Sequence, residues 1–168
     1  MKDFKRAIIL IAPILLLYTP SFSQDSSEYI KALYYIIKQN PDKNIVVSDT
    51  IIHFPFTIFS KHISEIWGKN RNVVSDTLYK VDQEQEKLEF ELNEFKNLQF
   101  PGSGPTQVIY FSNFYSSMVI GEILEKRISK HGLNHDAQTG FNESTQYLFL
   151  FDEKHAIKRV FKELYIYD

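Results

Sequence analysis

The 168-residue sequence contains no cysteine, and this absence excludes several kinds of chemistry. No disulfide can cross-link the fold, and no thiolate can bind a metal ion or act as a nucleophile. An N-terminus anchored through a lipid-modified cysteine is excluded for the same reason. Packing must therefore stabilise the fold, and 14 Phe, 10 Tyr and 1 Trp supply the bulk for it.

Basic charge is not in excess either. The chain has 19 basic and 21 acidic residues, a formal net charge of −2. A protein with this balance and no basic stripe has no electrostatic reason to bind nucleic acid. We therefore expect no nucleic-acid partner.

The longest apolar run lies near the N-terminus, at residues 7–18, after a positively charged start at residues 2–6. The small residues of Ser21-Phe22-Ser23 follow it, and this order is typical of a secretory signal peptide. The run spans about 12 residues, fewer than the ~20 that cross a bilayer as a helix. We expect cleavage before Gln24, export to the periplasm or the medium, and no permanent membrane anchor.

Removal of residues 1–23 leaves residues 24–168, a length that suits one globular domain. Without Lys2, Lys5, Arg6 and Asp3, 16 basic and 20 acidic residues remain, a charge near −4. A chain of this size buries roughly 70% of its unfolded surface, enough for a core without cross-links.

The first half of this segment predicts mixed secondary structure. A helix begins at Ser26 or Ser27 and ends near Gln39, with an apolar stripe of Ile30, Leu33, Tyr34 and Ile37. A β-branched run predicts a strand over residues 44–48. The apolar stretch 51–59, broken by Pro55, predicts an edge strand or an irregular segment, and residues 63–67 a short helix that ends at Gly68.

Further along, residues 73–81 are β-branched and indicate a second strand, and Asp82 is a candidate N-cap of a helix that reaches Asn97. The pentapeptide Val46–Thr50 recurs letter for letter as Val73–Thr77. A duplicated strand–helix unit would explain the repeat, but the flanking residues barely align and we favour a chance match.

The second half predicts mainly strands after a loop at residues 100–105. The candidates are residues 108–111, 118–128, 146–151 and 157–167, and residues 152–155 form a tight turn into the last one. A helical stripe competes in the last segment, but its β-rich ending favours a strand. The expected fold is α+β: an N-terminal helix packed on a mainly antiparallel sheet with a C-terminal β-hairpin or meander. We expect burial of Leu33, Ile37, Val46, Leu92, Phe111, Leu148 and Leu150.

Two histidines four residues apart, His131 and His135, would share one face of a helix and suggest a metal site. A third ligand such as Asp136, Glu143 or His155 would have to fold alongside. The glycines and asparagine around them instead favour a solvated polar loop. We therefore assign no metal ligand, no cofactor-binding residue and no catalytic residue.

Other patterns are weaker. Gly102-Ser103-Gly104 has prolines on both sides and no helix after it, so a turn-forming linker is favoured over a nucleophile elbow. Asp49 and Asp76, one in each pentapeptide, are carboxylates to watch. The glutamates of residues 84–94 alternate with lysine as on a solvated helix face. Aromatic clusters at residues 54–67 and 111–115 could stack on a ligand, although most must belong to the core.

The ending Ser21-Phe22-Ser23-Gln24 is similar to cleavage sites of secreted Bacteroidetes proteins. Together with the runs Leu92–Asn97 and Val108–Phe114 and a closing hairpin, the chain resembles a loose set of small secreted proteins of that group. Glu94 stands where those proteins have aspartate, and their Gly-rich segment and Lys-Trp ending are missing. The resemblance implies export and an α+β fold, and it assigns no activity.

These observations favour a secreted or periplasmic, non-enzymatic binding domain that needs no cofactor and whose partner the sequence does not identify. The alternative is a small metal-dependent or acid–base hydrolase that uses His131, His135 or His155 with nearby carboxylates. The two hypotheses differ in whether those histidines and an acid meet in a concave pocket.

Overall fold

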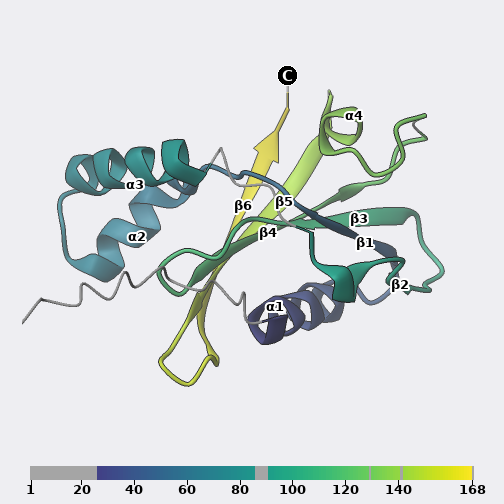
Figure 1. Ribbon diagram of the computed structural model, residues 1–168, viewed down its shortest axis with the longest axis horizontal. Coiled ribbons are helices and arrows are strands. Elements are labelled where there is room, and N and C mark those ends of the chain that lie inside the picture. The colour runs from purple at the N-terminus through teal and green to yellow at the C-terminus, as the bar shows by residue number, and fades with distance from the viewer. Residues whose placement is uncertain (1–25, 86–90, 129, 141, 168) are drawn as a thin grey trace, which may run out of the picture.

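The computed structural model describes residues 26–85, 91–128, 130–140 and 142–167. Within them, one six-stranded sheet has the order β2-β1-β3-β4-β5-β6 (Figure 1). The strands are β1 (Asn44–Ile51), β2 (Gln99–Phe100), β3 (Thr106–Phe111), β4 (Met118–Glu125), β5 (Glu143–Phe151) and β6 (Ile157–Ile166). Four neighbouring pairs are antiparallel and the β1–β3 pair is parallel. The predicted α+β fold with a C-terminal hairpin is confirmed.

Helix α1 (Ser26–Gln39) covers one face of the sheet, and its bounds match the prediction (Figure 1). The predicted apolar stripe was wrong for two of its four members, because Ile30 is 37% and Tyr34 61% exposed, whereas Leu33 is buried and Ile37 partly buried. The buried side chains are Tyr29, Ala32, Leu33 and Ile36. Close packing selects this face: a Cβ on Gly121 of β4 would lie 2.8 Å from the Ile36 side chain.

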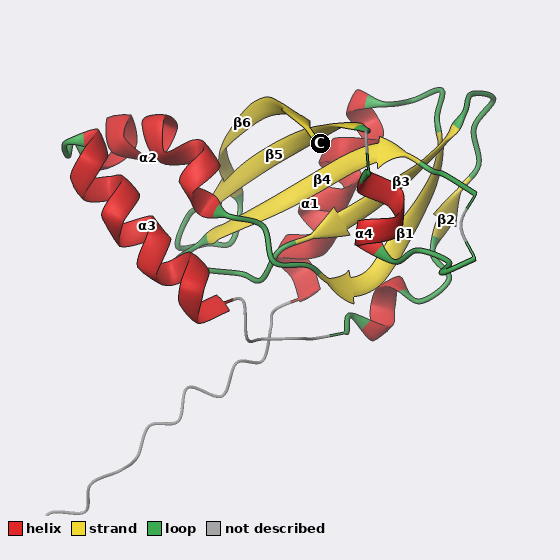
Figure 2. Cartoon of the chain, turned by 90° about the horizontal axis from the view of Figure 1, so that it is seen from above, coloured by secondary structure: helices red, strands yellow, loops and turns green. Residues whose placement is uncertain are grey.

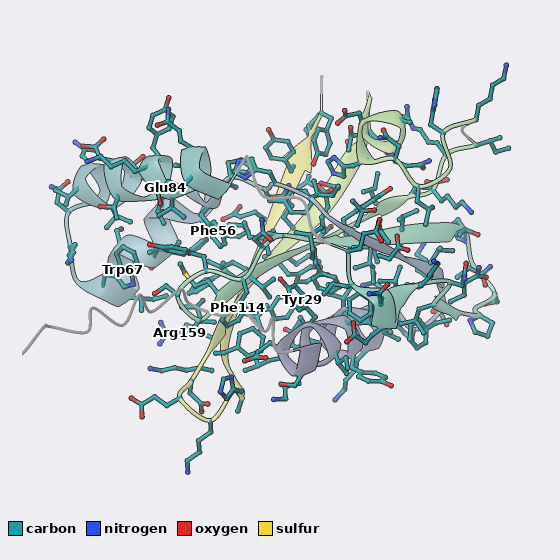
Figure 3. All side chains as sticks on the ribbon, in the orientation of Figure 1. Tyr29, Phe56, Trp67, Glu84, Phe114 and Arg159 are labelled. Carbon is teal, nitrogen blue, oxygen red and sulfur yellow. The ribbon has the colours of Figure 1, made fainter. Side chains whose placement is uncertain are left out.

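The other face is covered by a short 3₁₀ turn, η1 (Phe56–Phe59), and by helices α2 (Ser60–Trp67) and α3 (Arg71–Gln85). The two helices lie side by side at one end of the sheet (Figure 2), and Phe56 packs between α3 and the strands (Figure 3). As predicted, α2 ends at Gly68, whose φ of 61° is the left-handed conformation that glycine adopts without strain.

Two predictions in this region were wrong. Residues 73–81 belong to α3 and not to a strand, because Val74, Leu78 and Val81 form a helical stripe buried against this face. Asp82 lies inside α3 and begins no helix. Its carboxylate instead accepts hydrogen bonds from the backbone N–H groups of Phe56 (2.8 Å) and Thr57 (3.3 Å).

The predicted helix up to Asn97 was also wrong at its described end. Residues 91–97 hold a short 3₁₀ turn, η2 (Asn93–Phe95), before β2, while residues 86–90 lie outside the described part of the chain. Leu92 is buried as predicted, and Phe95 is buried beside it in the same core cluster. The turn is held because the Leu92 N–H donates to the Asp49 carbonyl (2.7 Å), which ties it to β1.

Strands β4 and β5 are inner strands of the sheet and are buried on both faces. The turn into β6 is held by Asp152, whose Oδ1 accepts from the N–H groups of Lys154 and Ala156 (both 2.9 Å). The helical alternative for the last segment is excluded, because β6 pairs with β5 along its length. Of the predicted core, Leu33, Leu92, Phe111 and Leu148 are buried, whereas Ile37, Val46 and Leu150 are partly buried. None of the described helices is both long and apolar enough to span a membrane.

Candidate functional site

A fully buried carboxylate, Glu122, lies in the middle of β4 on the face that α2 and α3 share. Its Oε1 accepts hydrogen bonds from the Ser144 hydroxyl (2.6 Å), the Gln146 side-chain amide (3.0 Å) and the Tyr167 hydroxyl (2.5 Å). Ser144 and Gln146 reach it because they lie on the paired strand β5 with the same facing. Such a carboxylate requires partners, since the desolvation of an unpaired buried charge costs on the order of several kcal/mol.

The second oxygen of Glu122 holds a histidine. Its Oε2 lies 2.7 Å from Nε2 of His135, the first residue of helix α4 (His135–Thr139). Asn134 caps that helix by accepting from the Ala137 N–H (3.1 Å). The His135 side chain is 11% exposed, so one edge of the imidazole still reaches solvent.

The protonation states of this cluster follow from its contacts. Burial acts to raise the pKa of Glu122, but the hydrogen bond that it accepts from His135, with those from Ser144 and Tyr167, outweighs burial and holds this pKa below its usual 4.5. Burial, followed by the nearby Glu122 charge, raises the pKa of Tyr167, which therefore stays a neutral donor. Ionised Glu122 thus stabilises the fold above pH 4.5, and that contribution is lost as the pH falls through its lowered pKa.

Three aromatic rings fix the orientation of the His135 imidazole. The ring centroids of Tyr110, Phe54 and Tyr167 lie 4.9, 5.3 and 5.8 Å away, all in edge-to-face geometry. Tyr110 also donates to the Leu133 carbonyl (2.9 Å) and thereby holds the preceding loop on the sheet. Among the described residues no hydrogen bond uses Nδ1 of His135, which remains available to a ligand.

His135 lines a pocket of about 340 Å³ together with Ser48, Asp49, Thr50, Ile52, His131, Leu133 and Asn134. The pocket exists because β1 bulges beside Tyr110: Val47 pairs with Ile109 and Ile51 with Phe111, so four steps on β1 oppose two on β3. The Ser48 hydroxyl holds the bulge by accepting from the Thr50 N–H (3.2 Å). Bulges often re-aim side chains next to functional sites.

Another pocket, of about 470 Å³, is larger but holds no comparable group. It lies beside Thr106, and the basic side chains that line it, Lys126 and Arg127, are exposed. The pocket beside His135 is therefore the better candidate, because the buried Glu122 orients the His135 ring that lines it.

The structure separates the histidines that the sequence singled out. His131 and His135 meet at one pocket, whereas His155 pairs with Glu28 of α1 on the opposite face. The expectation of a polar loop was wrong for His135, which begins α4. Asp136 is exposed, and Glu143 lines a different pocket. Within the described ranges, no three histidine or acidic side chains are placed to hold a metal ion.

The remaining candidates are structural or exposed. Gly102 and Gly104 form the predicted turn and pack on the backbone of Asp42 and Lys43, where a Cβ would lie within 2.7 Å of a carbonyl oxygen. Phe54, Phe56, Phe59 and Phe111 are core residues, and Trp67, Phe114 and Tyr115 are partly buried. Glu84, Glu91 and Glu94 are exposed, and the other glutamates of that run lie outside the described residues.

Sequence reasoning missed Glu122 and Tyr167, the acid and the hydroxyl of the site. Glu122 did carry a signal, since it is a lone carboxylate inside the apolar run Val119–Leu124 of a central strand. Tyr167 carried none, because it follows β6 and meets Glu122 only through the sheet register.

Fold and site together define an α+β protein with an acid–imidazole pair at the wall of a polar pocket. No family model matches the chain, and comparisons with curated proteins and with solved structures found no match either.

Proposed function

We propose that this is an exported bacterial protein that binds a small polar ligand in the pocket lined by Asp49, His131 and His135. Export is supported by the order of positive, apolar and small residues in residues 2–23. Mass spectrometry of the protein recovered from the host's envelope or medium tests it. Recovery of an intact Met1 in a membrane fraction would overturn this part of the proposal.

Binding is supported by one observation above the others, the pre-set orientation of His135. Glu122 holds Nε2, three rings hold the imidazole plane, and Nδ1 has no hydrogen bond among the described residues, while the His135 side chain lines the pocket. A polar group fixed in this way loses little conformational entropy when a ligand binds to it.

The binding proposal is tested by screening small molecules against the purified protein for thermal stabilisation and for shifts of ¹⁵N amide signals. We expect ligands to shift the signals of residues 48–50 and 131–135 together. His135→Gln should weaken ligand binding. His155→Gln, whose histidine lies on the other face of the sheet, should bind the ligands as the wild type does. Shifts confined to another surface would refute the proposal.

A second candidate function, acid–base hydrolysis, is favoured by the contact of 2.7 Å between Glu122 and His135. A carboxylate that holds one ring nitrogen leaves the other to take a proton from water, which is the geometry of a general base. Turnover of small esters that disappears in both Glu122→Gln and His135→Gln would favour the enzyme. Zinc stabilisation that is lost in His131→Ala would favour its metal-dependent form.

A further inference from the structure

We propose that the ligand of this pocket carries a small ammonium group, which pairs with Asp49 and donates a hydrogen bond to Nδ1 of His135. This inference rests on the proposed binding function and names the chemical class of the ligand. It begins from two groups among the residues that line the pocket, the Asp49 carboxylate and the His135 imidazole.

The first acceptor is Asp49, in the β1 bulge. Its backbone carbonyl accepts from Leu92, but among the described residues its carboxylate has no hydrogen bond or ion pair. An aspartate that borders a pocket without a partner is open to a cation or a donor from outside the protein. Asp76, the counterpart of Asp49 in the second pentapeptide, is exposed on α3 and does not line this pocket.

The second acceptor is Nδ1 of His135. The Glu122 carboxylate accepts from Nε2, so in the neutral form of the ring Nε2 carries the proton and Nδ1 presents a lone pair. Among the described residues no donor occupies this lone pair. An ammonium group, with three N–H donors, can satisfy the Asp49 carboxylate and the imidazole at once.

The charges around the pocket favour the same ligand. Asp49 lines the pocket, and the buried Glu122 contacts the His135 ring that also lines it, so an anion in the pocket would lie near negative charge. Lys126 and Arg127, which follow β4, line another pocket. Besides His135, the described lining residues of this pocket include one other histidine, His131, and no lysine or arginine.

The test uses three probes of similar size and different charge: 2-aminoethanol, ethylene glycol and glycolate. Each is titrated into the wild-type protein, Asp49→Asn and Asp76→Asn, and binding is followed by ¹⁵N signals of the backbone and of the His135 ring. We expect 2-aminoethanol to bind most tightly and to shift the His135 Nδ1 signal. Asp49→Asn should weaken it about tenfold, the loss of one charge-assisted hydrogen bond, and Asp76→Asn should not.

The outcomes separate this inference from the binding function. Preference for glycolate, or equal binding of glycol and amine, overturns the ammonium assignment while ligand binding at the pocket stands. If neither these probes nor the wider screen shifts the pocket residues, both proposals fail. If Asp49→Asn does not fold, the wild-type His135 ring signal still decides, because an amine bound elsewhere leaves Nδ1 unchanged.

Discussion

The pentapeptide Val-Val-Ser-Asp-Thr occurs twice in this chain and folds in two different ways. As Val46–Thr50 it lies in β1, and as Val73–Thr77 it lies in α3. The burial differs accordingly: Val73 is 55% exposed, while its counterpart Val46 is partly buried in the sheet. Five identical residues therefore do not determine even the type of secondary structure.

The hydroxyls show how each context uses the same side chains. In β1, the Ser48 hydroxyl accepts from the Thr50 N–H and holds the bulge that borders the candidate site. In α3, the Thr77 hydroxyl donates to the carbonyl of Val73, four residues earlier (2.8 Å). Serine and threonine side chains that bond to nearby backbone are compatible with both structures.

The flanking residues decide between the two structures. Ile45 and Val47 are two residues apart and lie on the same face of a strand. Val74 is followed by Leu78 and Val81 at helical spacing. Asn70 adds a cap, because its Oδ1 accepts from the Asn72 N–H (2.9 Å). The repeat thus supplies matched substitutions in two environments.

Proline at the first valine of each pentapeptide should give the largest difference in stability between the two copies. Val46 pairs with Gln99 on one side and Val108 on the other, so Val46→Pro removes a ladder hydrogen bond from inside the sheet. We expect it to cost about 3 kcal/mol or more, or to prevent folding. Val73 lies in the first turn of α3, where the N–H has no helical partner, and Val73→Pro should cost about 1 kcal/mol at most. Urea unfolding measures both, and equal losses would contradict the assignment of the two structures.

Truncation of the buried valines should give the next largest effects. Val47 is 2% exposed and Val74 is fully buried, so each alanine leaves a cavity. We expect Val47→Ala to lower the free energy of unfolding by about 2 kcal/mol. Val74→Ala should cost about 0.5 kcal/mol less, because alanine is the better helix former. The reverse order in chemical denaturation would show that cavity size outweighs propensity here.

The aspartates should differ in function more than in stability. Asp49→Asn should weaken binding of an ammonium ligand about tenfold, while Asp76→Asn leaves the affinity unchanged. Both variants should unfold within about 0.5 kcal/mol of the wild type, as surface substitutions usually do. Isothermal titration and thermal melts are the measurements, and equal affinity in the two variants would remove Asp49 from the site.

The smallest effects should have opposite signs. Val73→Ala replaces an exposed helical residue and should stabilise the protein by about 0.5 kcal/mol. Val46→Ala replaces a partly buried strand residue and should destabilise it by up to about 1 kcal/mol. Paired thermal melts check this prediction, and a gain in both variants would mean that the first valine of β1 contributes nothing to the sheet.

Much of the fold was accessible from local patterns. Strands β3 to β6 and helix α1 came from apolar periodicity and turn residues, because these signals act within a few residues. Residues 73–81 were predicted as a strand because they are β-branched. In the structure they form a helix, because Val74, Leu78 and Val81 are then buried together against Phe54 and its neighbours. The buried face of α1 was missed because Gly121 and Ile36, far apart in sequence, select it by close contact.

Only part of the candidate site could be predicted from the sequence. The spacing of His131 and His135 singled out the right segment, although the sequence favoured a solvated loop there, and Glu122 was missed because its partners depend on strand register. Glu122 meets His135 across 13 residues of sequence and Tyr167 across 45. No periodicity within one segment encodes such contacts.

The sequence by itself determined that this protein has no cross-links, an aromatic core and most of its strands, because composition and local periodicity depend only on neighbouring residues. Only the tertiary structure decided which copy of the pentapeptide became a helix and which carboxylate came to face His135. The reason is that burial and sheet pairing join distant segments, and the free energy of those contacts exceeds the small local preferences of each segment.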